Sequence, residues 1–202
     1  MTVCIIDDDA SMRGALQRLL RAADLSPRAY GSVGDYLLDP LPDEVPGCLL
    51  VDVYLPGPSG LDLQAALRRG AHPRPMVFMS GSADVPTSVR AMRGGAVDFL
   101  TKPIERDALL AALHRALELD AAHRRDARAH AELRSRRASL TPREREVFDA
   151  VAAGRLNKQI AADLGVCERT VKAHRAGVMA KFGAATAADL GRIAERLRAT
   201  DA

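Results

Sequence analysis

The chain has no tryptophan, 3% aromatic residues and only three cysteines among its 202 residues. Cys4, Cys48 and Cys167 form no CxxC pair and no Cys/His cluster, so the sequence supports neither a disulfide framework nor a zinc site. No apolar run approaches the ~20 residues that a membrane span needs. The first residues, MTVCIIDDD, lack the basic start of a secretory signal, so we expect a cytoplasmic protein without membrane contact.

Positive charge is the minority in the first part of the chain, and negative charge is the minority in the second part. Residues 1–118 hold 12 Lys/Arg against 15 Asp/Glu, a net charge of −3, whereas residues 119–202 hold 17 against 11, a net charge of +6. An acidic part followed by a basic part predicts two domains with different partners. The basic part is the candidate for binding nucleic acid.

The acidic part alternates short apolar runs with helical patterns. We interpret the runs as five strands, at 3–6, 25–30, 48–51, 76–79 and 97–100, with helices at 10–23, 33–38, 59–69 and 84–93. This alternation predicts right-handed crossovers and an α/β fold, a doubly wound five-stranded parallel sheet. Because the runs are continuously apolar, we expect both faces of the sheet to be covered by helices.

From residue 105 to 137 the chain has neither Gly nor Pro and is rich in strong helix formers. This composition predicts one long helix, or two helices end to end, joining the two parts. Residues 119–137 are polar nearly all round, and we interpret them as a solvated helical linker. A signalling or dimerising helix is the alternative.

The basic part, 138–202, predicts an all-α domain of four helices. The segment TPRE at 141–144 is a capping box with Pro at the first helical position, and Gly154 ends that helix. Asn157 is expected to cap a short second helix that ends at Gly165. The expected helices are 142–153, 157–164, 168–182 and 186–198.

Polar side chains follow four of the five predicted strands. They are Asp7, Asp8 and Asp9 after the first strand, Asp52 after the third, Ser80 after the fourth and Lys102 after the fifth. Ligands of such sheets bind at the carboxyl ends of the strands, where the strand order reverses, so these groups converge if the first and third strands are neighbours. Converging carboxylates repel one another unless a cation neutralises them, and oxygen ligands suit Mg²⁺ or Mn²⁺.

This set of groups fits phosphoryl chemistry. A carboxylate beside Mg²⁺ is a competent nucleophile towards phosphorus, while Lys102 and Ser80 can neutralise or hydrogen-bond the phosphoryl oxygens. Singly, each residue has an ordinary explanation, and Asp9 is expected to cap the helix that follows it. Their joint occurrence predicts that an aspartate accepts a phosphoryl group.

Residues 1–118 resemble a response-regulator receiver domain. The matching motifs are IIDDD at 5–9, LLVDVYLPGPSGLDL at 49–63, MSGSADVP at 79–86 and GAVDFLTKP at 95–103. The resemblance implies that Asp52 is the phosphoacceptor. It also implies a metal site in which Asp8, Asp52 and the backbone carbonyl of Tyr54 bind directly and Asp7 binds through water.

The same resemblance implies a switch. Ser80 is then the switch hydroxyl, Phe99 the switch aromatic and Lys102 the cation that pairs with the phosphate, with a cis peptide bond at Lys102–Pro103. A phosphoryl group adds roughly −1.5 to −2 charge, which draws in Ser80 and vacates space for Phe99. Phe99 as a plain core aromatic is the alternative.

Residues 157–176 predict a helix-turn-helix, with a Gly turn before a basic second helix. The candidate DNA contacts are Asn157, Lys158, Arg169, Thr170, Lys172, Arg175 and Lys181. Without further pattern, such charges merely solubilise a small bundle. However, residues 138–200 resemble the LuxR-type domain of NarL/FixJ-class regulators, through LTPREREVFDAVAAG at 140–154 and ERTVKAHRAGVMAKFG at 168–183.

That resemblance implies that the helix from residue 168 enters the major groove, with Thr170, Lys172 and Arg175 near DNA. It also implies that the last helix, 186–198, contributes to dimerisation. Two positions depart from the family pattern. Cys167 stands at the cap of the recognition helix in place of Ser or Thr, a loss of about 1 kcal/mol. Gly177 costs about 1 kcal/mol relative to Ala and is expected to remove a DNA contact.

Together these features predict a two-component response regulator with a receiver at 1–118, a linker at 119–137 and a DNA-binding domain at 138–202. A sensor histidine kinase is expected to phosphorylate Asp52. Phosphorylation then favours a homodimer, or releases an inhibited DNA-binding half, on double-stranded DNA. We expect no enzyme activity beyond slow self-dephosphorylation. The alternatives are an Asp-nucleophile, Mg²⁺-dependent phosphatase, for which the chain lacks a substrate cap, and a constitutive DNA-binding protein with a vestigial receiver.

Overall fold

The computed structural model describes residues 1–68, 70, 73–82 and 84–198. The chain divides into two compact units, Met1–Arg124 and Arg125–Ala202. Residues 119–124 of the expected linker therefore lie with the first unit, and the boundaries at 118 and 138 stay predictions. The helix end expected at residue 69, the motif residue 83 and the last four residues of the chain lie outside the described residues.

The first unit is built on a parallel sheet of five strands in the order β2-β1-β3-β4-β5. This confirms the predicted fold class, and each strand end lies within one residue of its prediction. The strands are β1 (Thr2–Ile6), β2 (Ser26–Tyr30), β3 (Gly47–Asp52), β4 (Met76–Ser80) and β5 (Asp98–Thr101). The strand order reverses beside β1, which has β2 on one side and β3 on the other.

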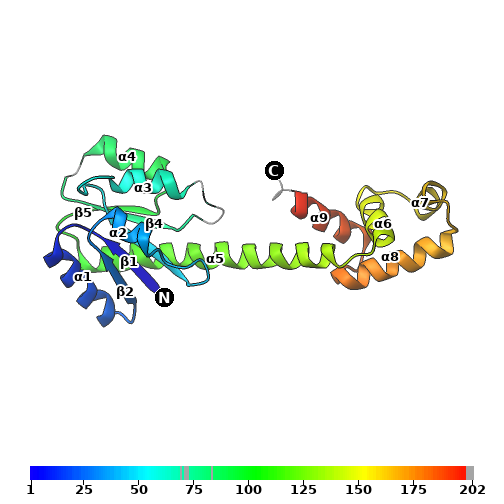
Figure 1. Cartoon of the computed structure of the whole chain (residues 1–202), viewed down its shortest axis with the longest axis horizontal. Helices are drawn as coiled ribbons and strands as arrows, with labels where there is room; N and C mark the ends of the chain where they lie inside the picture. Colours follow the sequence, from blue (N-terminus) through cyan, green and yellow to red (C-terminus); the bar gives the residue numbers. More distant parts are fainter. Residues whose placement is uncertain (69, 71–72, 83, 199–202) are drawn as a thin grey trace. The chain divides into compact units, whose positions relative to one another are not determined.

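Helices cover both faces of this sheet, as the continuous apolar runs predicted. They are α1 (Ala10–Ala22), α2 (Val33–Leu38), α3 (Gly60–Leu67), α4 (Val85–Arg93) and α5 (Arg106–Ala138). Leu63 of α3 and Ala91 of α4 pack on one face with Phe78, whereas α1 and α5 pack on the other face around Ile5 and Leu50. Figure 1 shows α3 and α4 on the opposite side of the strands from α5.

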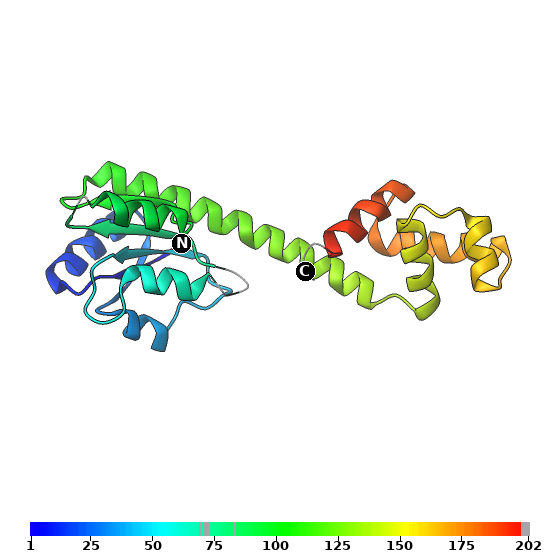
Figure 2. The ribbon, with the colours of Figure 1, turned by 90° about the horizontal axis from the view of Figure 1, so that it is seen from above.

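The helix α5 runs without a break over 33 residues. This confirms the expectation of one long helix between the two parts of the sequence, as Figure 2 shows. Its buried residues, including Leu109, Leu113 and Leu117, all lie before position 121. The rest of the helix is rich in charged residues, and its Leu133 packs against the core of the second unit. Among the described helices, none is both long enough and apolar enough to cross a membrane.

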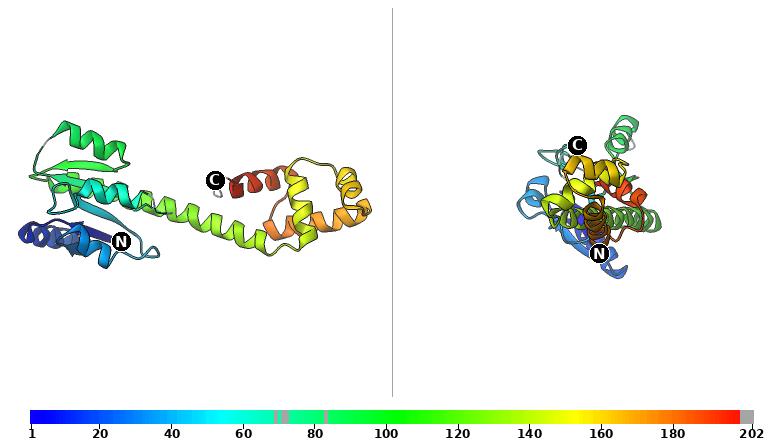
Figure 3. Two further views of the ribbon diagram at one scale, coloured as in Figure 1. Left: turned by 45° about the horizontal axis from the view of Figure 1, so that its top comes forward. Right: turned by 90° about the vertical axis from the view of Figure 1, so that its right-hand side faces the viewer.

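The second unit packs four further helices around its own core. They are α6 (Pro142–Ala152), α7 (Asn157–Leu164), α8 (Glu168–Phe182) and α9 (Ala187–Arg198). The helix α6 packs against both α8 and α9, and α7 packs against α8 (Figure 3). The rings of Phe148 and Phe182 stack with their centroids 4.9 Å apart and join α6 to α8.

One predicted helix cap is wrong. The helix α7 has Leu156 as its N-cap, and the backbone N–H of Leu156 donates to the side-chain oxygen of Gln159 at 2.9 Å. Asn157 is the first residue of the helix, and its side chain is engaged elsewhere. Gly165 ends α7 as predicted, with a φ of 64° that places it in the left-handed region.

Candidate phosphoacceptor site and nucleic-acid interface

The acidic groups meet at the point where the strand order reverses. Asp7 follows β1 and Asp52 ends β3, and these strands are neighbours with Ile6 opposite Val51. One carboxylate oxygen from each of Asp7, Asp8 and Asp52 lies within 4.8 Å of the others. The expected convergence of these three residues is therefore confirmed. Asp7 and Asp52 are buried, whereas Asp8 is exposed.

Backbone amides hold the two buried carboxylates in place. Asp7 accepts from the N–H of Asp9 at 2.8 Å, and Asp52 accepts from the N–H of Tyr54 at 2.9 Å. Asp9 caps α1, as predicted, by accepting from the N–H of Ser11 at 2.8 Å. The turns after both strands thus fix the direction of these side chains while leaving Asp8 outside.

Lys102, directly after β5, brings the balancing positive charge. Its ammonium donates to Oδ2 of Asp7 at 2.9 Å and to Oδ2 of Asp52. Burial by itself lowers the pKa of Lys102, but the hydrogen bonds and charges of Asp52 and Asp7 outweigh burial and raise that pKa above its ordinary value. The bond Lys102–Pro103 is cis, as expected.

The other expected switch residues lie on the neighbouring strands β4 and β5. Ser80 is fully buried at the end of β4, and its hydroxyl donates to the carbonyl of Ser82 at 2.9 Å. The N–H of Lys102 donates to the carbonyl of Ser80 at 2.7 Å and ties the ends of β4 and β5 together. Phe99 is half-buried on β5, opposite Phe78. The side chain of Tyr54 is exposed.

Two residues that shape this site were not identified from the sequence. A Cβ at Gly60 would lie 2.5 Å from the carbonyl oxygen of Asp52, so only glycine lets α3 begin so close to the end of β3. Arg13 of α1 donates to the carbonyl of Asp7 at 2.7 Å. The glycine stands in the quoted motif at 49–63, which is the one signal that was available for it.

The helix-turn-helix places some of the expected DNA contacts on the surface. Lys158, Arg169 and Lys172 are exposed, and Thr170 is half-buried. Arg175 is half-buried and donates to the side chain of Asn157 at 3.0 Å, so these two residues connect α8 to the start of α7. The pairing explains why Asn157 does not cap its helix.

Lys181 lies apart from the other candidates. Its ammonium donates to Glu144 at 2.6 Å and to the carbonyl of Ser139 at 3.1 Å. The hydrogen bond from Lys181, followed by that from the N–H of Thr141, lowers the pKa of Glu144 to about 2. The charge of Lys181 is thus used to join α8 to the capping box of α6, and a contact of Lys181 with DNA stays a prediction without support from this structure.

Gly177 also has a different explanation from the one expected. A Cβ at this position would lie 3.2 Å from the carboxylate of Glu144, so the position lies against α6. Its expected effect on DNA contacts stays a prediction. Cys167 is the N-cap of α8 and, as predicted, makes no side-chain cap hydrogen bond. Its thiol lies 3.2 Å from the hydroxyl of Thr170, and that contact lowers the pKa of Cys167.

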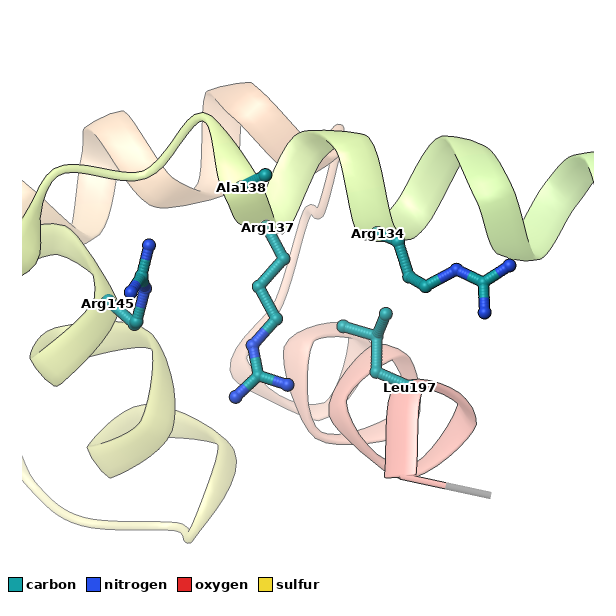
Figure 4. Close-up of a pocket in the computed structure, with 5 residues that line it drawn as sticks. All are labelled: Arg134, Arg137, Ala138, Arg145 and Leu197. Atoms are coloured by element: carbon teal, nitrogen blue, oxygen red, sulfur yellow. The ribbon is translucent and has the colours of Figure 1, made fainter. Parts of the chain in front are cut away.

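The second unit also carries a basic pocket of about 290 Å³. It is lined by Arg134, Arg137 and Ala138 of α5, Arg145 of α6 and Leu197 of α9 (Figure 4). The three guanidinium groups point in different directions, and Arg137 lies 3.6 Å from Asp149. The pocket adds to the positive charge of this unit, but its cations do not converge on a single point.

Comparison with protein families accounts for both units. Residues 3–114 match the response regulator receiver domain, and residues 138–194 match bacterial regulatory proteins of the luxR family. The chain therefore belongs to the response regulators that combine a receiver with a LuxR-type DNA-binding domain. It is a transcription regulator of the two-component class, which is a regulatory family rather than a class of enzymes.

Individual relatives cover nearly the whole chain. The chain is 46% identical over 195 residues to Nodulation protein W of Bradyrhizobium diazoefficiens, covering 96% of this chain and 86% of that protein. It is 40% identical over 196 residues to response regulator protein TodT of Pseudomonas putida, covering 97% of this chain and 86% of that protein. The solved structure of the response regulator StyR is similar, with a TM-score of 0.83 and 38% identity over 96% of this chain and 98% of that chain.

Proposed function

We propose that Asp52 accepts a phosphoryl group from a sensor histidine kinase and that this event controls binding to double-stranded DNA. The observation that carries the proposal is the position of Asp52. Its carboxylate lies beside two other carboxylates, is held by the ammonium of Lys102, and stands at the reversal of strand order. The receiver implies a phosphodonor kinase and the LuxR-type domain implies DNA as a partner.

The donor set fits Mg²⁺ or Mn²⁺. The three carboxylates Asp7, Asp8 and Asp52 offer oxygen ligands within 4.8 Å of one another, and Lys102 balances only part of their charge. Oxygen-rich sites with room for water are typical of Mg²⁺. We assign direct binding to Asp8, Asp52 and the carbonyl of Tyr54, and binding through water to Asp7. When bound, the ion neutralises charge on the phosphoryl oxygens.

The transfer step follows from the side chains. A carboxylate oxygen of Asp52 attacks the phosphorus of the phosphohistidine, so that a P–O bond forms while the P–N bond breaks. The electron pair of the P–N bond leaves with the imidazole, which takes a proton from solvent. Lys102, already within reach of Asp52, follows the new charge and pairs with a phosphoryl oxygen.

The switch then involves Ser80 and Phe99. In the structure the Ser80 hydroxyl donates a hydrogen bond to the backbone carbonyl of Ser82. A phosphoryl group on Asp52 offers a stronger, charged acceptor, which draws the hydroxyl away from Ser82 and opens space for Phe99. The resulting change favours a homodimer, whose two DNA-binding halves bind paired half-sites with increased avidity.

On DNA, the helix α8 is assigned to the major groove. Arg169, Thr170 and Lys172 are assigned to base edges or nearby phosphates, and Lys158 of α7 is assigned to the phosphate backbone. Asn157 and Arg175 hydrogen-bond to each other where α7 and α8 meet. We assign this pair to one common contact with DNA at that junction. Exposed cations of this kind give a salt-dependent affinity.

The proposal is tested by intact-mass analysis after incubation with acetyl phosphate and Mg²⁺. We expect the wild type to gain one phosphoryl mass, Asp52→Asn to gain none, and the control Asp107→Asn, at an exposed carboxylate of α5, to behave as wild type. Equal labelling of Asp52→Asn would contradict the proposal. Rapid turnover of p-nitrophenyl phosphate by the wild type would instead favour the phosphatase alternative.

A further inference from the structure

A buried ionic cluster lies at the edge of the sheet opposite the acidic site. Its carboxylate is Asp120 of α5, whose Oδ2 accepts from the N–H of Gly47 at 3.0 Å, at the first residue of β3. Arg124 donates to the same oxygen at 2.7 Å, and Arg74 lies 3.7 Å from Oδ1. We refer to Arg74, Asp120 and Arg124 as the Asp120 cluster.

The two arginines extend this cluster into the loop before β3. Arg124 and Arg74 each donate to the carbonyl of Val45 at 2.6 Å, and Arg74 also donates to the carbonyls of Leu41 and Pro42. The side chains of Arg74 and Asp120 are only 7% and 8% exposed. The Asp120 cluster thus joins three segments of the first unit: α5, the 41–47 loop and the residues before β4.

Such a cluster is better suited to fixing an arrangement than to stabilising the fold. Buried ion pairs lose about as much in desolvation as they gain in attraction, but breaking one partner leaves an uncompensated charge. Slippage or rotation of α5 would separate Asp120 from Gly47 and from both arginines. The cluster therefore selects a single rotational setting of α5 on the receiver.

Elsewhere in the described part of the first unit, α5 is held by apolar contacts and by a more exposed ion pair between Arg115 and Asp98 of β5. The side chains of Leu109, Leu113 and Leu117 pack on the sheet, and Asp120 is the last buried residue of the helix. The N-terminal end of α5, at Arg106, begins four positions after Lys102. At its N-terminal end α5 is thus connected to the phosphoacceptor site by the short segment after Lys102. At the opposite edge of the sheet it is held by the Asp120 cluster.

We propose that Asp120 is a positioning residue that makes α5 a rigid extension of the receiver, so that a change at Lys102 moves the helix as one body. The proposal rests on the proposed function, because it concerns how phosphorylation reaches the residues beyond 124. Without the cluster, α5 rotates and frays at residues 118–124. A structural change at Lys102 then does not move the part of the helix beyond residue 124.

The first test measures positioning directly, without phosphorylation. Hydrogen exchange is compared in the full chain for wild type, Asp120→Asn and the control Asp126→Asn, which alters an exposed carboxylate on the same helix. We expect amides of residues 118–126 and 41–47 to exchange about tenfold faster in Asp120→Asn and unchanged in the control. Unchanged exchange in Asp120→Asn would overturn the positioning role. Arg124→Gln is a second variant that leaves Arg74 to pair with Asp120 and keeps the test valid if Asp120→Asn does not fold.

The second test measures coupling. The probe is a duplex selected from a random-sequence pool with wild-type protein in beryllofluoride and Mg²⁺. We expect the gain in affinity on adding beryllofluoride to shrink about tenfold in Asp120→Asn, while labelling by acetyl phosphate stays at the wild-type level. A full gain in Asp120→Asn would overturn the proposal. Absence of any gain in the wild type would overturn the proposed function instead, and the exchange result would still decide the positioning role.

Discussion

At the scale of single residues, the acidic site is a balance of one cation against three anions. Lys102 hydrogen-bonds to both Asp7 and Asp52, which are buried, while Asp8 stays in solvent. Carboxylates this close raise each other's free energy unless more positive charge arrives. The residual negative charge is the physical reason why this site is expected to attract a divalent ion before it accepts a phosphoryl group.

Glu144 allows a residue-scale prediction about pH. Its pKa of about 2 in the folded chain lies below the ordinary 4.5, chiefly because Lys181 donates to it. A depressed folded pKa contributes stability above pH 4.5, and that contribution is lost as the pH falls towards 2. We expect Glu144→Gln to lower the melting temperature at pH 7 and to approach wild type near pH 2.5, as measured by circular dichroism.

The control for this prediction is Glu195→Gln, which changes an exposed carboxylate on α9. It should leave the melting temperature close to wild type throughout the range. A difference between wild type and Glu144→Gln that stays constant from pH 7 to pH 2.5 would refute the account of Glu144 given above.

At the scale of elements, glycines decide where the helices of the second unit end. Gly165 has a φ of 64° between α7 and α8, a left-handed conformation that is strained for any residue with a Cβ. Gly191 lies inside α9, where an added Cβ would meet only ordinary contacts at 3.7 Å. The same substitution at the two positions therefore has opposite effects.

We expect Gly165→Ala to destabilise the second unit by about 1–2 kcal/mol because of its left-handed backbone. Gly191→Ala is expected to stabilise the same unit by up to ~1 kcal/mol through helix propensity. Urea unfolding followed by circular dichroism measures both. Equal effects of the two variants would mean that the turn tolerates a side chain.

The recognition helix makes a second prediction at this scale. Lys172 is exposed on α8, whereas Lys181 is engaged by Glu144. If Lys172 contacts a phosphate, Lys172→Gln should reduce the slope of log K against log salt by about 1, and Lys181→Gln should leave the slope unchanged. Fluorescence anisotropy with a selected duplex at several salt concentrations measures the slopes. Identical slopes for wild type and Lys172→Gln would remove this residue from the interface.

At the scale of the whole molecule, an acidic receiver and a basic DNA-binding unit are joined by one continuous helix. This organisation separates the chemistry of phosphate from the reading of DNA. Tethering two weak DNA-binding units in a dimer makes the second contact intramolecular and raises the overall affinity. Under the proposed function, phosphorylation needs to act only on the association of two receivers.

We therefore expect the molar mass in solution to double when beryllofluoride and Mg²⁺ are added to the wild type. Size-exclusion chromatography with light scattering measures this change. Asp52→Asn should keep the mass it has without beryllofluoride. A wild type whose mass is the same in both conditions would favour the alternative, in which phosphorylation releases an inhibited DNA-binding half without forming a dimer.

Local patterns account for most of what was predicted correctly. Strands appeared as apolar runs, Asp9 and the segment 141–144 as caps, and Gly165 as a turn, because each depends on residues a few positions apart. The wrong cap, and the contacts that the sequence did not predict, involve partners distant in the sequence. Asn157 bonds to Arg175, and Gly177 faces Glu144, and no local pattern contains such pairs.

The sequence by itself determined the order of the elements, the class of each unit and the identity of the strand-end residues, because hydrophobic periodicity and short motifs are properties of neighbouring residues. Only the tertiary structure decided which polar groups are already used. In the folded chain Lys181 is hydrogen-bonded to Glu144. Asp120 accepts from the N–H of Gly47, 73 positions away, and so lies inside the receiver rather than in a solvated linker. The physical reason is that burial and ion pairing depend on distances in space, which the spacing of residues along a chain does not fix.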